Sequence, residues 1–589
     1  MTPRIDVASP PRADAPSTLG AMVLDSARRH SGVALQFQRH GRPAYISYSE
    51  LGTISSEIAR GLMSLGIESG DRVAILGLTS AQWTLAEWGA LCAGAVLTPI
   101  YHTNSPEECA YVLEHSGSRL IFCENADQAA KVAAVREGLP ELEHVVMLDA
   151  ASEEGISLDH LRRLGAEVPP AAVEERLAAL EPGDLATLVY TSGTTGPPKG
   201  CMLSHENFLA TTKMYAEQLN FRESHSMYQF LPLAHVLARI AEAVALTVGA
   251  RVIYWAGDST KIIEELALTG PTHFPAVPRI YEKIHGAVTT SVAESPAAQR
   301  ALFSWALRAG GRTRPALRAG ELPGVLDDLR FRLANRLVLD RVRSLFGANL
   351  EMAIVGAAPI ARELLEFFDA CGVLVLEGYG LTESCAAATV NTLDAVKLGS
   401  VGKPLPGTEV AIAPDGEVML RGPHVFQGYY RDPEATAATL SADGWLLTGD
   451  LGRLDTEGFL HITGRKKDLI ITSSGKNVTP VNIESLLRDS RYIAEAVVYG
   501  DNRPYLVAVV TLEPDQDAKL TDPDERRAVI QDEVDAVNAK LARIEQIKRF
   551  AILDHEFSQA SGELTPTLKV KRAVVYAKYA DVFDRLYAG

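Results

Sequence analysis

Short apolar runs alternate with longer stretches of mixed polarity along most of the chain. Arg72–Leu78, RVAILGL, has the pattern of a buried strand, and the amphipathic stretch from Ser80 predicts a helix with that serine as its N-cap. The same pairing recurs with LATLVY before a helix near Asn207–Leu219, ARVIYWA before a helix near Lys261, and LEMAIVGAA before a helix at Ala361–Ala370. Strands that alternate with crossover helices predict an α/β fold of mainly parallel sheets covered on both faces.

The pattern changes near Asp394, where short strands and turns such as GTEVAIAPDGEVMLRG predict a small β subdomain over about residues 394–463. The polar segment TGRKKD then precedes a strand, a Gly/Ser turn and a new helix, so we place a domain boundary there. The expected organisation is a flexible leader at residues 1–20, an N-terminal domain at 21–466 and a C-terminal domain at 467–589. An Arg/Ala/Leu-rich stretch between Ser291 and Phe346 predicts additional helices.

Composition narrows the class of protein. The 589 residues are 47% hydrophobic and carry a formal charge of -17, which is typical of a large globular protein and argues against a nucleic-acid binder. The six cysteines form no CxxC pair, so neither a zinc site nor a disulfide framework is indicated. The N-terminus lacks the apolar core of a secretory signal, and the most apolar region, Val73–Tyr101, is interrupted by Glu87 and three glycines. We therefore expect a cytoplasmic protein with reduced thiols.

A Gly/Thr-rich segment, TSGTTGPPKG at Thr191–Gly200, directly follows an apolar strand. Its amides, hydroxyls and single lysine are suited to phosphate oxygens. It differs from a P-loop, because the lysine is followed by Gly200 instead of a hydroxyl residue. The residues expected to contact phosphate are Thr191, Ser192, Gly193, Thr194, Thr195 and Lys199.

Four further motifs follow in order: YGLTES at 379–384, DGWLLTGD at 443–450, GRKKD at 464–468 and LTPTLKVKR at 564–572. With the Gly/Thr-rich segment, they resemble those of the adenylate-forming superfamily, which includes acyl-CoA synthetases, acyl-AMP ligases, luciferases and peptide-synthetase adenylation domains. The resemblance covers nearly the whole chain. It implies a large N-terminal AMP-binding domain, a small mobile α+β C-terminal domain, and ATP with Mg2+ as the activating nucleotide.

The resemblance agrees with what the nucleotide motifs offer chemically. Tyr379 provides a flat face for a purine, Thr382 a hydroxyl for the α-phosphate, and Glu383 a hard oxygen ligand that would hold Mg2+ together with Thr191. The Asp450 carboxylate can accept hydrogen bonds from both ribose hydroxyls. By family position, Arg465 completes the ribose and phosphate end, and Gly356 lies beside the adenine. Many relatives have a Gly-Gly-Ala-Pro turn beside the adenine. In this chain Gly356 is followed by Ala357, which adds a methyl group to the turn.

Four other residues take their expected roles mainly from the resemblance. Lys569 would stabilise the charge that develops at the α-phosphorus, although a solvated basic tail is the alternative. Lys467 stands at the position of the interdomain hinge, where an ordinary surface lysine is the alternative. Gly475 would approach CoA, and His235 would lie near the carboxylate or the mouth of the acyl tunnel unless it is a structural histidine.

The predicted substrate is a long-chain fatty acid. The segments that indicate it are LPLAHVLAR at 231–239, VPRIYEKI at 277–284 and the helical insertion that follows, which look most like those of bacterial long-chain fatty acyl-CoA synthetases. Small residues at 386–388 leave room for an alkyl chain. The expected enzyme is an AMP-forming long-chain fatty acid–CoA ligase that uses ATP, Mg2+ and CoA. The alternatives are a fatty acyl-AMP ligase that delivers to a carrier-protein thiol, a non-catalytic lipid or nucleotide sensor, and a luciferase.

Partners beyond the substrates are less defined. Peripheral membrane contact suits an enzyme that draws fatty acids from a bilayer, but no basic amphipathic helix stands out. A homodimer is compatible with the resemblance. ATP and CoA are polyanions, whereas the whole chain carries a net charge of -17. Both can still bind, because lysines and arginines are concentrated in the nucleotide motifs.

Overall fold

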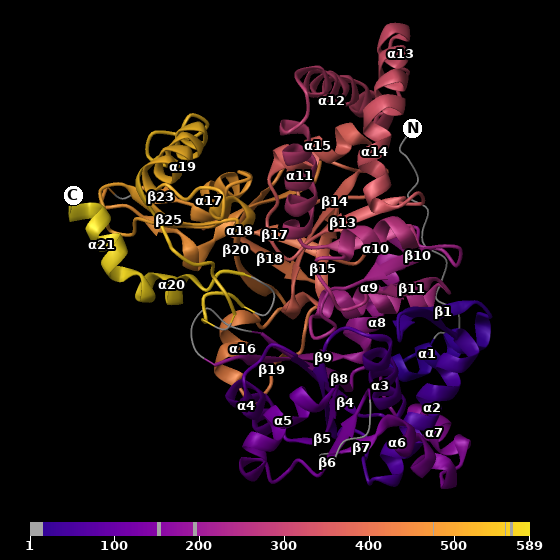
Figure 1. Cartoon of the computed structure of the whole chain (residues 1–589). Helices are drawn as coiled ribbons and strands as arrows, with labels where there is room; N and C mark the ends of the chain where they lie inside the picture. Colours follow the sequence, from indigo (N-terminus) through magenta and orange to yellow (C-terminus); the bar gives the residue numbers. More distant parts are fainter. Residues whose placement is uncertain are drawn as a thin grey trace.

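The computed structural model describes residues 16–149, 155–191, 197–474, 476–559, 561–565 and 569–588. The N-terminal two thirds of the chain build two large sheets, a four-stranded sheet follows, and the remaining residues form a separate group of strands and helices (Figure 1). No helix in the described part of the chain is long and apolar enough to cross a membrane.

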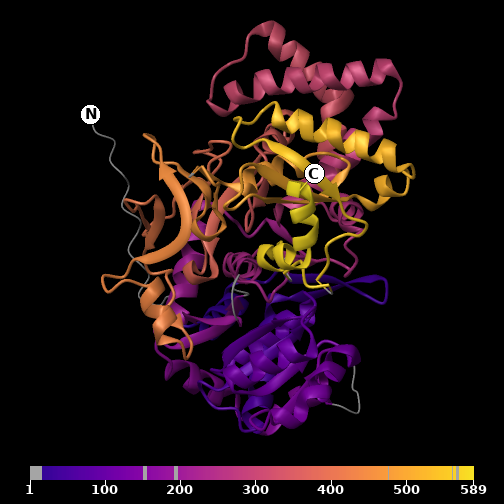
Figure 2. The same ribbon diagram turned by 90° about the vertical axis from the view of Figure 1, so that its left-hand side faces the viewer.

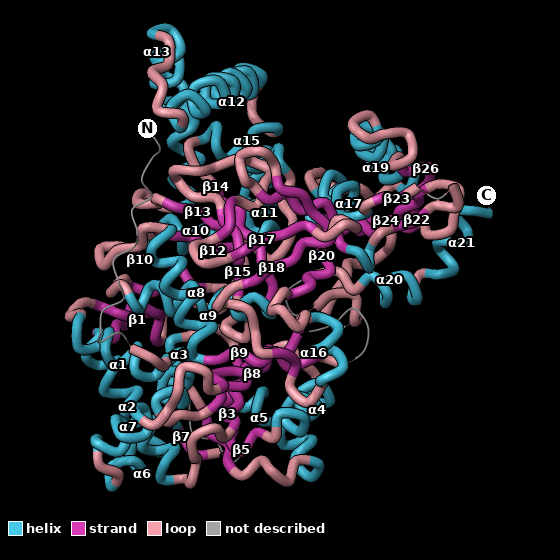
Figure 3. Tube along the Cα trace, turned by 180° about the vertical axis from the view of Figure 1, so that it is seen from behind, coloured by secondary structure: helices cyan, strands magenta, loops and turns pink. Residues whose placement is uncertain are grey.

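The first large sheet has eight strands in the order β19-β9-β8-β4-β3-β5-β6-β7. Strands β8, β4, β3, β5, β6 and β7 run parallel, and β9 and β19 close one edge in antiparallel pairings. Figure 3 shows α3 on one side of this sheet and α4 and α5 on the other. The strands are β3 (Arg72–Gly77), β4 (Val96–Tyr101), β5 (Ser118–Cys123), β6 (His144–Met147), β7 (Ile156–Ser157), β8 (Leu185–Thr191), β9 (Lys199–Ser204) and β19 (Gly428–Tyr429), and the helices are α3 (Ala81–Cys92), α4 (Pro106–Ser116) and α5 (Ala126–Val135).

The second large sheet has nine strands in the order β16-β15-β14-β13-β12-β10-β11-β1-β2. Its central strands are parallel, and β2, β15 and β16 pair antiparallel at the two edges. These sheets confirm the predicted α/β fold with mainly parallel strands. The strands are β1 (Val33–Arg39), β2 (Arg42–Ser47), β10 (Ser226–Gln229), β11 (Arg251–Tyr254), β12 (His273–Ala276), β13 (Met352–Val355), β14 (Val375–Leu381), β15 (Ala386–Val390) and β16 (Lys403–Pro404).

The predicted helix after Ser80 is α3, and Ser80 caps it by accepting a hydrogen bond from the backbone N–H of Trp83. The amphipathic interpretation of this helix is wrong, because every residue of α3 except Gln82 is buried. One hydrophobic core contains its side chains together with residues of both large sheets, so α3 has no solvent face to present.

The other predicted strand and helix pairs are also present. Strand β8 precedes α8 (His205–Gln218), β11 precedes α10 (Ile262–Thr269), and β13 precedes α15 (Arg362–Cys371). At the N-terminus, α1 (Leu19–Arg29) begins inside the expected leader, and its cap Thr18 is buried. All six cysteines are buried and none is in a disulfide.

After the large sheets come an antiparallel β sheet and the C-terminal elements. The four strands are β17 (Glu409–Ile412), β18 (Glu417–Arg421), β20 (Leu446–Leu454) and β21 (Leu460–Arg465), in the order β17-β18-β20-β21. The C-terminal elements have hydrophobic clusters of their own on both faces of a three-stranded sheet. They include α17 (Pro480–Arg488), β24 (Ile493–Tyr499), β25 (Leu506–Leu512), α19 (Pro523–Asn538), β26 (Ile547–Ile552), α20 (Arg572–Lys578) and α21 (Ala580–Ala588).

The Arg/Ala/Leu-rich stretch forms helices, as predicted. They are α11 (Pro278–Ala293), α12 (Ala297–Arg318), α13 (Val325–Ala334) and α14 (Asp340–Arg343), with a π-helical turn at Asn335–Leu339. Figure 2 shows α12 and α13 at the periphery of the molecule, beyond the nine-stranded sheet.

A buried polar network joins α3 to α9 (Val236–Thr247). The Arg239 guanidinium donates to Glu87 at 2.6 Å, and the neighbouring Glu242 carboxyl contacts the hydroxyls of Thr84 and Tyr254 at 3.0 and 2.9 Å. Burial, reinforced by the charge of Glu87, raises the pKa of Glu242 to about 8. One cation therefore neutralises one carboxylate, and the second carboxyl is held protonated at neutral pH.

The network predicts a pH-dependent stability. Because the raised pKa favours the protonated native state, the stability contributed by Glu242 is complete below its unfolded pKa and is lost as pH rises through about 8. Glu242→Gln stays uncharged, so its free energy of unfolding relative to wild type should increase by about 1.4 kcal/mol per pH unit between pH 5 and about pH 8, and its Tm relative to wild type should increase with it. Thermal unfolding across this pH range measures the difference, and the exposed Glu264→Gln is the control. Parallel Tm profiles for wild type and Glu242→Gln would contradict the assignment.

Candidate active site

A cavity of about 2420 Å³ lies among the two large sheets, the four-stranded sheet and the C-terminal elements. Every predicted site residue that the structure describes lines this cavity. They are Thr191, Lys199, His235, Gly356, Tyr379, Thr382, Glu383, Asp450, Arg465, Lys467 and Lys569. The other predicted contacts, Ser192, Gly193, Thr194, Thr195 and Gly475, lie outside the described residues.

The Asp450 carboxylate lies in the cavity wall and is held by donors from two other residues. The antiparallel register of β20 and β21 places it opposite Arg465, whose Nε donates to Oδ1 at 2.8 Å. The Tyr379 hydroxyl, from β14, donates to Oδ2 at 2.8 Å. Burial and the charge of Asp450 raise the pKa of Tyr379, so the hydroxyl remains a donor. Each carboxylate oxygen retains a lone pair for a further donor, such as a ribose hydroxyl.

Glu383 lies in a short 3-10 turn, Thr382–Ser384, that directly follows β14. Its Oε1 accepts a hydrogen bond from the Tyr429 hydroxyl at 2.7 Å. Lys199 Nζ stands 5.0 Å from the centre of the Tyr429 ring and 3.9 Å from Asp432 Oδ2. Tyr429 thus separates a carboxylate from a lysine, and both face the cavity.

Tyr429 is a site residue that sequence reasoning missed. It belongs to the two-residue strand β19, which pairs with β9 through Tyr429 and Cys201. Its partner Glu383 is 46 residues away in the sequence. The GYY sequence at 428–430 was the only local signal, and without the β19–β9 pairing it does not indicate a carboxylate partner.

A divalent cation could be held at Glu383. The described residues contain no group of three or more histidine, cysteine, aspartate or glutamate side chains that could hold a metal ion. A single carboxylate suits Mg2+, which usually keeps several waters and takes its other ligands from substrate phosphates. Thr191 belongs to the same cavity lining, at the end of β8.

Lys569 reaches the cavity from the C-terminal elements. Its side chain is accessible to the water of this large cavity, yet the surrounding protein and the nearby Arg465 lower its pKa to about 8. The charges of Asp450 and Glu383 act in the opposite direction and favour the ammonium form. The lysine is therefore a cation within electrostatic range of two carboxylates that come from distant parts of the chain.

His235 is the N-cap of α9, where its Nδ1 accepts a hydrogen bond from the backbone N–H of Leu237 at 3.2 Å. Burial, followed by the charge of Lys569, lowers the pKa of His235 to about 3. The ring is neutral at physiological pH, and with Nδ1 as the acceptor its proton lies on Nε2. His235 therefore has a structural role as the cap of α9, and its Nε2–H is a hydrogen-bond donor in the cavity lining.

The turn after β13 contains Gly356 and Ala357, where the sequence departs from the Gly-Gly-Ala-Pro pattern. Ala357 has φ +68°, a left-handed conformation that is unfavourable for a residue with a Cβ. A Cβ added to Gly356 would be 3.5 Å from the Gly378 carbonyl oxygen, an ordinary contact. The steric demand for glycine in this turn is therefore at position 357, where this chain carries alanine.

The apolar part of the cavity includes Ala386 and Ala387, whereas Ala388 is fully buried and does not line it. The Tyr215 hydroxyl accepts a hydrogen bond from the Ala387 backbone N–H at 2.9 Å and fixes this strand. A Cβ on Gly380 would meet the Ala386 carbonyl oxygen at 1.8 Å, so glycine is required there. Further apolar lining comes from Val236, Leu237, Ala276, Val277, Ile354 and Val390.

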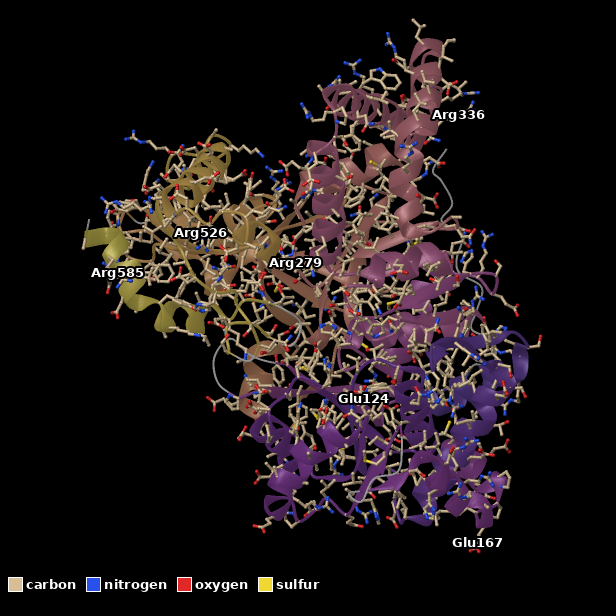
Figure 4. All side chains as sticks on the ribbon, in the orientation of Figure 1. Glu124, Glu167, Arg279, Arg336, Arg526 and Arg585 are labelled. Atoms are coloured by element: carbon tan, nitrogen blue, oxygen red, sulfur yellow. The ribbon has the colours of Figure 1, made fainter. Side chains whose placement is uncertain are left out.

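Ion pairs connect α11 to the C-terminal elements across the cavity. Arg279 Nη2 is 2.8 Å from Glu513 Oε1, and its Nη1 donates to the Ala494 carbonyl of β24 at 3.1 Å. Figure 4 shows Arg279 where the two parts of the molecule meet. In the connection, Lys466 and Lys467 are both exposed, and Lys466 pairs with Asp415 at 2.6 Å and with Glu417 at 2.7 Å.

Comparison with protein families gives two matches. The AMP-binding enzyme family matches residues 25–430, and the AMP-binding enzyme C-terminal domain matches residues 467–589. Long-chain-fatty-acid–CoA ligase FadD15 of Mycobacterium bovis is 37% identical over 95% of this chain and 97% of the relative. Long-chain-fatty-acid–CoA ligase ACSBG2 of Gallus gallus is 33% identical over 98% of this chain and 82% of the relative.

Solved structures share the fold. The adenylation domain of a carboxylate reductase from Mycobacterium chelonae superposes with a TM-score of 0.80 and 24% identity, covering 98% of this chain and 92% of that chain. At 24% identity, the similarity shows only that the two proteins share the arrangement of the sheets and of the C-terminal elements.

The electrostatics of the cavity predict the titration of Lys569. In reductively 13C-methylated protein, the Lys569 signal, assigned with Lys569→Arg, should titrate near pH 8. Asp450→Asn removes a charge that favours the ammonium form, so it should lower this midpoint further. Glu434→Gln, outside the cavity lining, is the control. A wild-type midpoint near the ordinary lysine value of about 10.4 would contradict the arrangement.

Proposed function

The chain belongs to the family of AMP-binding enzymes, and from this premise we propose that it is an AMP-forming long-chain fatty acid–CoA ligase. The observation that carries the proposal is that Lys569, Glu383 and Asp450 line one cavity with a large apolar part, where both carboxylates favour the ammonium form of the lysine. Full-length relatives named as long-chain fatty acid–CoA ligases support the choice of acid and of CoA as the acceptor.

The first half-reaction joins the acid to the nucleotide. A carboxylate oxygen of the fatty acid attacks the α-phosphorus of ATP, the bond to the β-phosphate breaks, and acyl-AMP and pyrophosphate are formed. Asp450 would hold the ribose hydroxyls, Tyr379 and Gly356 would lie against the adenine, and Thr382 would contact the α-phosphate. Lys569 is the cation that would meet the charge on the reacting phosphate, where it stabilises the transition state more than the ground state.

Mg2+ would be held by Glu383 and Thr191, and when bound it supplies charge neutralisation to the ATP phosphates. The fit rests on the Glu383 carboxyl, which lines the cavity and, among the residues that the structure describes, accepts one hydrogen bond, from Tyr429. Lys199 and the segment 192–195 are proposed to contact the outer phosphates. Arg465 is proposed to hold the ribose and phosphate end together with Asp450.

The second half-reaction transfers the acyl group. The CoA thiol, after losing its proton, attacks the acyl carbonyl, the bond to phosphate breaks, and acyl-CoA and AMP leave. We propose a domain boundary between residues 466 and 467, with Lys467 as the hinge and Gly475 on the face that would approach CoA. The start of the C-terminal family match at residue 467 supports this boundary.

The acid is bound by the apolar part of the cavity. Each buried methylene contributes about 0.8 kcal/mol, so an apolar wall suffices to hold a long alkyl chain. His235, with its proton on Nε2, can donate to the carboxylate end of the substrate. A fatty acyl-AMP ligase that delivers to a carrier protein would share the first half-reaction, and competition of CoA against a carrier-protein thiol distinguishes the two.

The proposed enzyme also contacts a membrane surface, from which long-chain acids are drawn. A homodimer is compatible with the proposed reaction.

The role of Lys569 predicts a selective loss. Lys569→Ala should slow acyl-AMP formation by about a hundredfold or more, the scale for losing one preorganised charge. Pyrophosphate exchange with a long-chain acid measures this step. Lys571→Ala, which removes a neighbouring cation of the same motif, should change the rate by no more than about twofold. Nearly normal exchange in Lys569→Ala would reject the assignment.

The hinge predicts a split between the half-reactions. Lys467→Pro restricts the backbone at the connection, so the variant should form acyl-AMP and transfer it poorly to CoA. Lys467→Ala removes the same charge without the restriction and should behave as wild type in both steps. Single-turnover assays of acyl-AMP and of acyl-CoA separate the steps. Equal loss, or equal retention, of both steps in Lys467→Pro would count against the hinge.

A further inference from the structure

Helix α13 and its flanks present a row of large apolar side chains to solvent. The exposed fractions are 96% for Leu322, 86% for Val325 and 69% for Leu326. Leu329, Leu333 and Leu337 continue the row at exposures from 65% to 42%. Within α13 and the π-helical turn after it, spacings of three and four residues place Leu326, Leu329, Leu333 and Leu337 along one side, beside Val325. Leu322 precedes the helix, in its connection to α12.

This row is unusual within the molecule. Eight of the fifteen large apolar side chains that are exposed in the described residues belong to α12, α13 and their connections. Scattered exposed leucines need no explanation, but a contiguous row marks an interaction surface. The apolar surface consists of Leu322, Val325, Leu326, Leu329, Leu333 and Leu337, and we call it the leucine row.

The leucine row is the outer side of an anchored helix. The inner side packs in a separate hydrophobic cluster, where Ala334, Leu339 and Val342 are buried with Ala306 of α12. The leucines are therefore not a surface left over from an incomplete core. Figures 1 and 2 both show α13 projecting at the edge of the molecule, away from the other domains.

The same region is cationic, although the whole chain carries a charge of -17. Residues 297–343 contain ten arginines and four acidic residues, with no lysine or histidine. Arg314 and Arg318 pair with Asp369 of α15, and Arg330 and Arg332 pair within α13. Five other exposed arginines have no ion pair in the described part of the chain: Arg300, Arg308, Arg312, Arg336 and Arg341. Figure 4 shows Arg336 beside the ribbon of this projecting region, below its outer tip.

We propose that the leucine row and its arginines bind the surface of an anionic lipid bilayer. Leucines enter the boundary between headgroups and acyl chains, and arginines meet the lipid phosphates while their aliphatic stems lie along apolar surface. A bilayer supplies both an apolar interior and a layer of phosphate anions, which complement the two features of this surface. A symmetric pairing with a second copy would cover the leucines but would bring two arginine-rich surfaces together.

The structure also explains why no basic amphipathic helix was evident in the sequence. Both sides of α13 are apolar, since Phe331 and Ala334 face the inner cluster while the leucine row faces outward. Two apolar sides in one helix obscure the single-sided pattern by which a membrane-surface helix is recognised. The proposal rests on the membrane contact of the proposed function and can be tested separately from the reaction, because no residue of the leucine row lines the cavity.

Sedimentation with lipid vesicles tests the proposal. The full-length protein should sediment with vesicles that contain equal parts of phosphatidylglycerol and phosphatidylcholine, and much less with phosphatidylcholine alone. Leu326→Ser/Leu329→Ser should lower the partition coefficient for anionic vesicles at least tenfold. Arg336→Glu/Arg341→Glu should lower it as well and should weaken its dependence on salt.

The matched control is Leu268→Ser, which changes a leucine that is 78% exposed on α10, far from the leucine row in sequence, and should leave sedimentation unchanged. Thermal unfolding and pyrophosphate exchange with a water-soluble short-chain acid show whether each variant is folded. A wild-type protein that does not sediment with anionic vesicles overturns the proposal, as does equal sedimentation of wild type and the double leucine variant. A wild-type dimer by light scattering that becomes monomeric in that variant also overturns it, because a second copy then covers the row.

Discussion

The Asp450 carboxylate is the interaction on which the arrangement of the site depends. It is buried at 4% exposure, and it is held by the Tyr379 hydroxyl from the nine-stranded sheet and by Arg465 from the strand beside it. Its charge also favours the ammonium form of Lys569, which comes from the C-terminal elements. Three parts of the chain thus converge on one anion. A shift of one residue between β20 and β21 would turn Arg465 to the other face of its strand and leave that anion with a single donor.

The motifs identified residues that the fold brings into one cavity, but they did not reveal the contacts that hold these residues in place. The phosphate segment and the terminal lysine motif are separated by more than half of the chain, yet Thr191 and Lys569 line the same cavity. Strand and helix pairs were also evident, because apolar strands and capped helices are local signals. Tyr429 was missed because its contact with Glu383 exists only through pairing at a sheet edge. The burial of α3 on all sides was missed because periodicity does not distinguish a core helix from a surface helix when polar residues such as Glu87 are neutralised inside.

The buried ion pair of Arg239 and Glu87 also affects the position of a site residue. Arg239 and Glu242 belong to α9, whose N-cap is His235, and their partners Glu87 and Thr84 belong to α3. A buried ion pair adds little net stability but is costly to break, because the remaining charge has no solvent. The network therefore restricts sliding of α9 along α3. It holds the histidine ring, already fixed by its capping hydrogen bond, in one place on the cavity wall.

The proposed hinge requires an interdomain contact that orders the site and can still be released. Arg279 and Glu513 are both partly exposed, and pairs of this kind contribute about 0 to 1 kcal/mol. Their geometry can therefore select the orientation that brings Lys569 to the cavity without opposing its release. The leucine row lies on α13, before the proposed hinge in the sequence. A bilayer bound there would hold the N-terminal part of the molecule and leave the C-terminal domain free to move, so membrane contact and turnover do not compete.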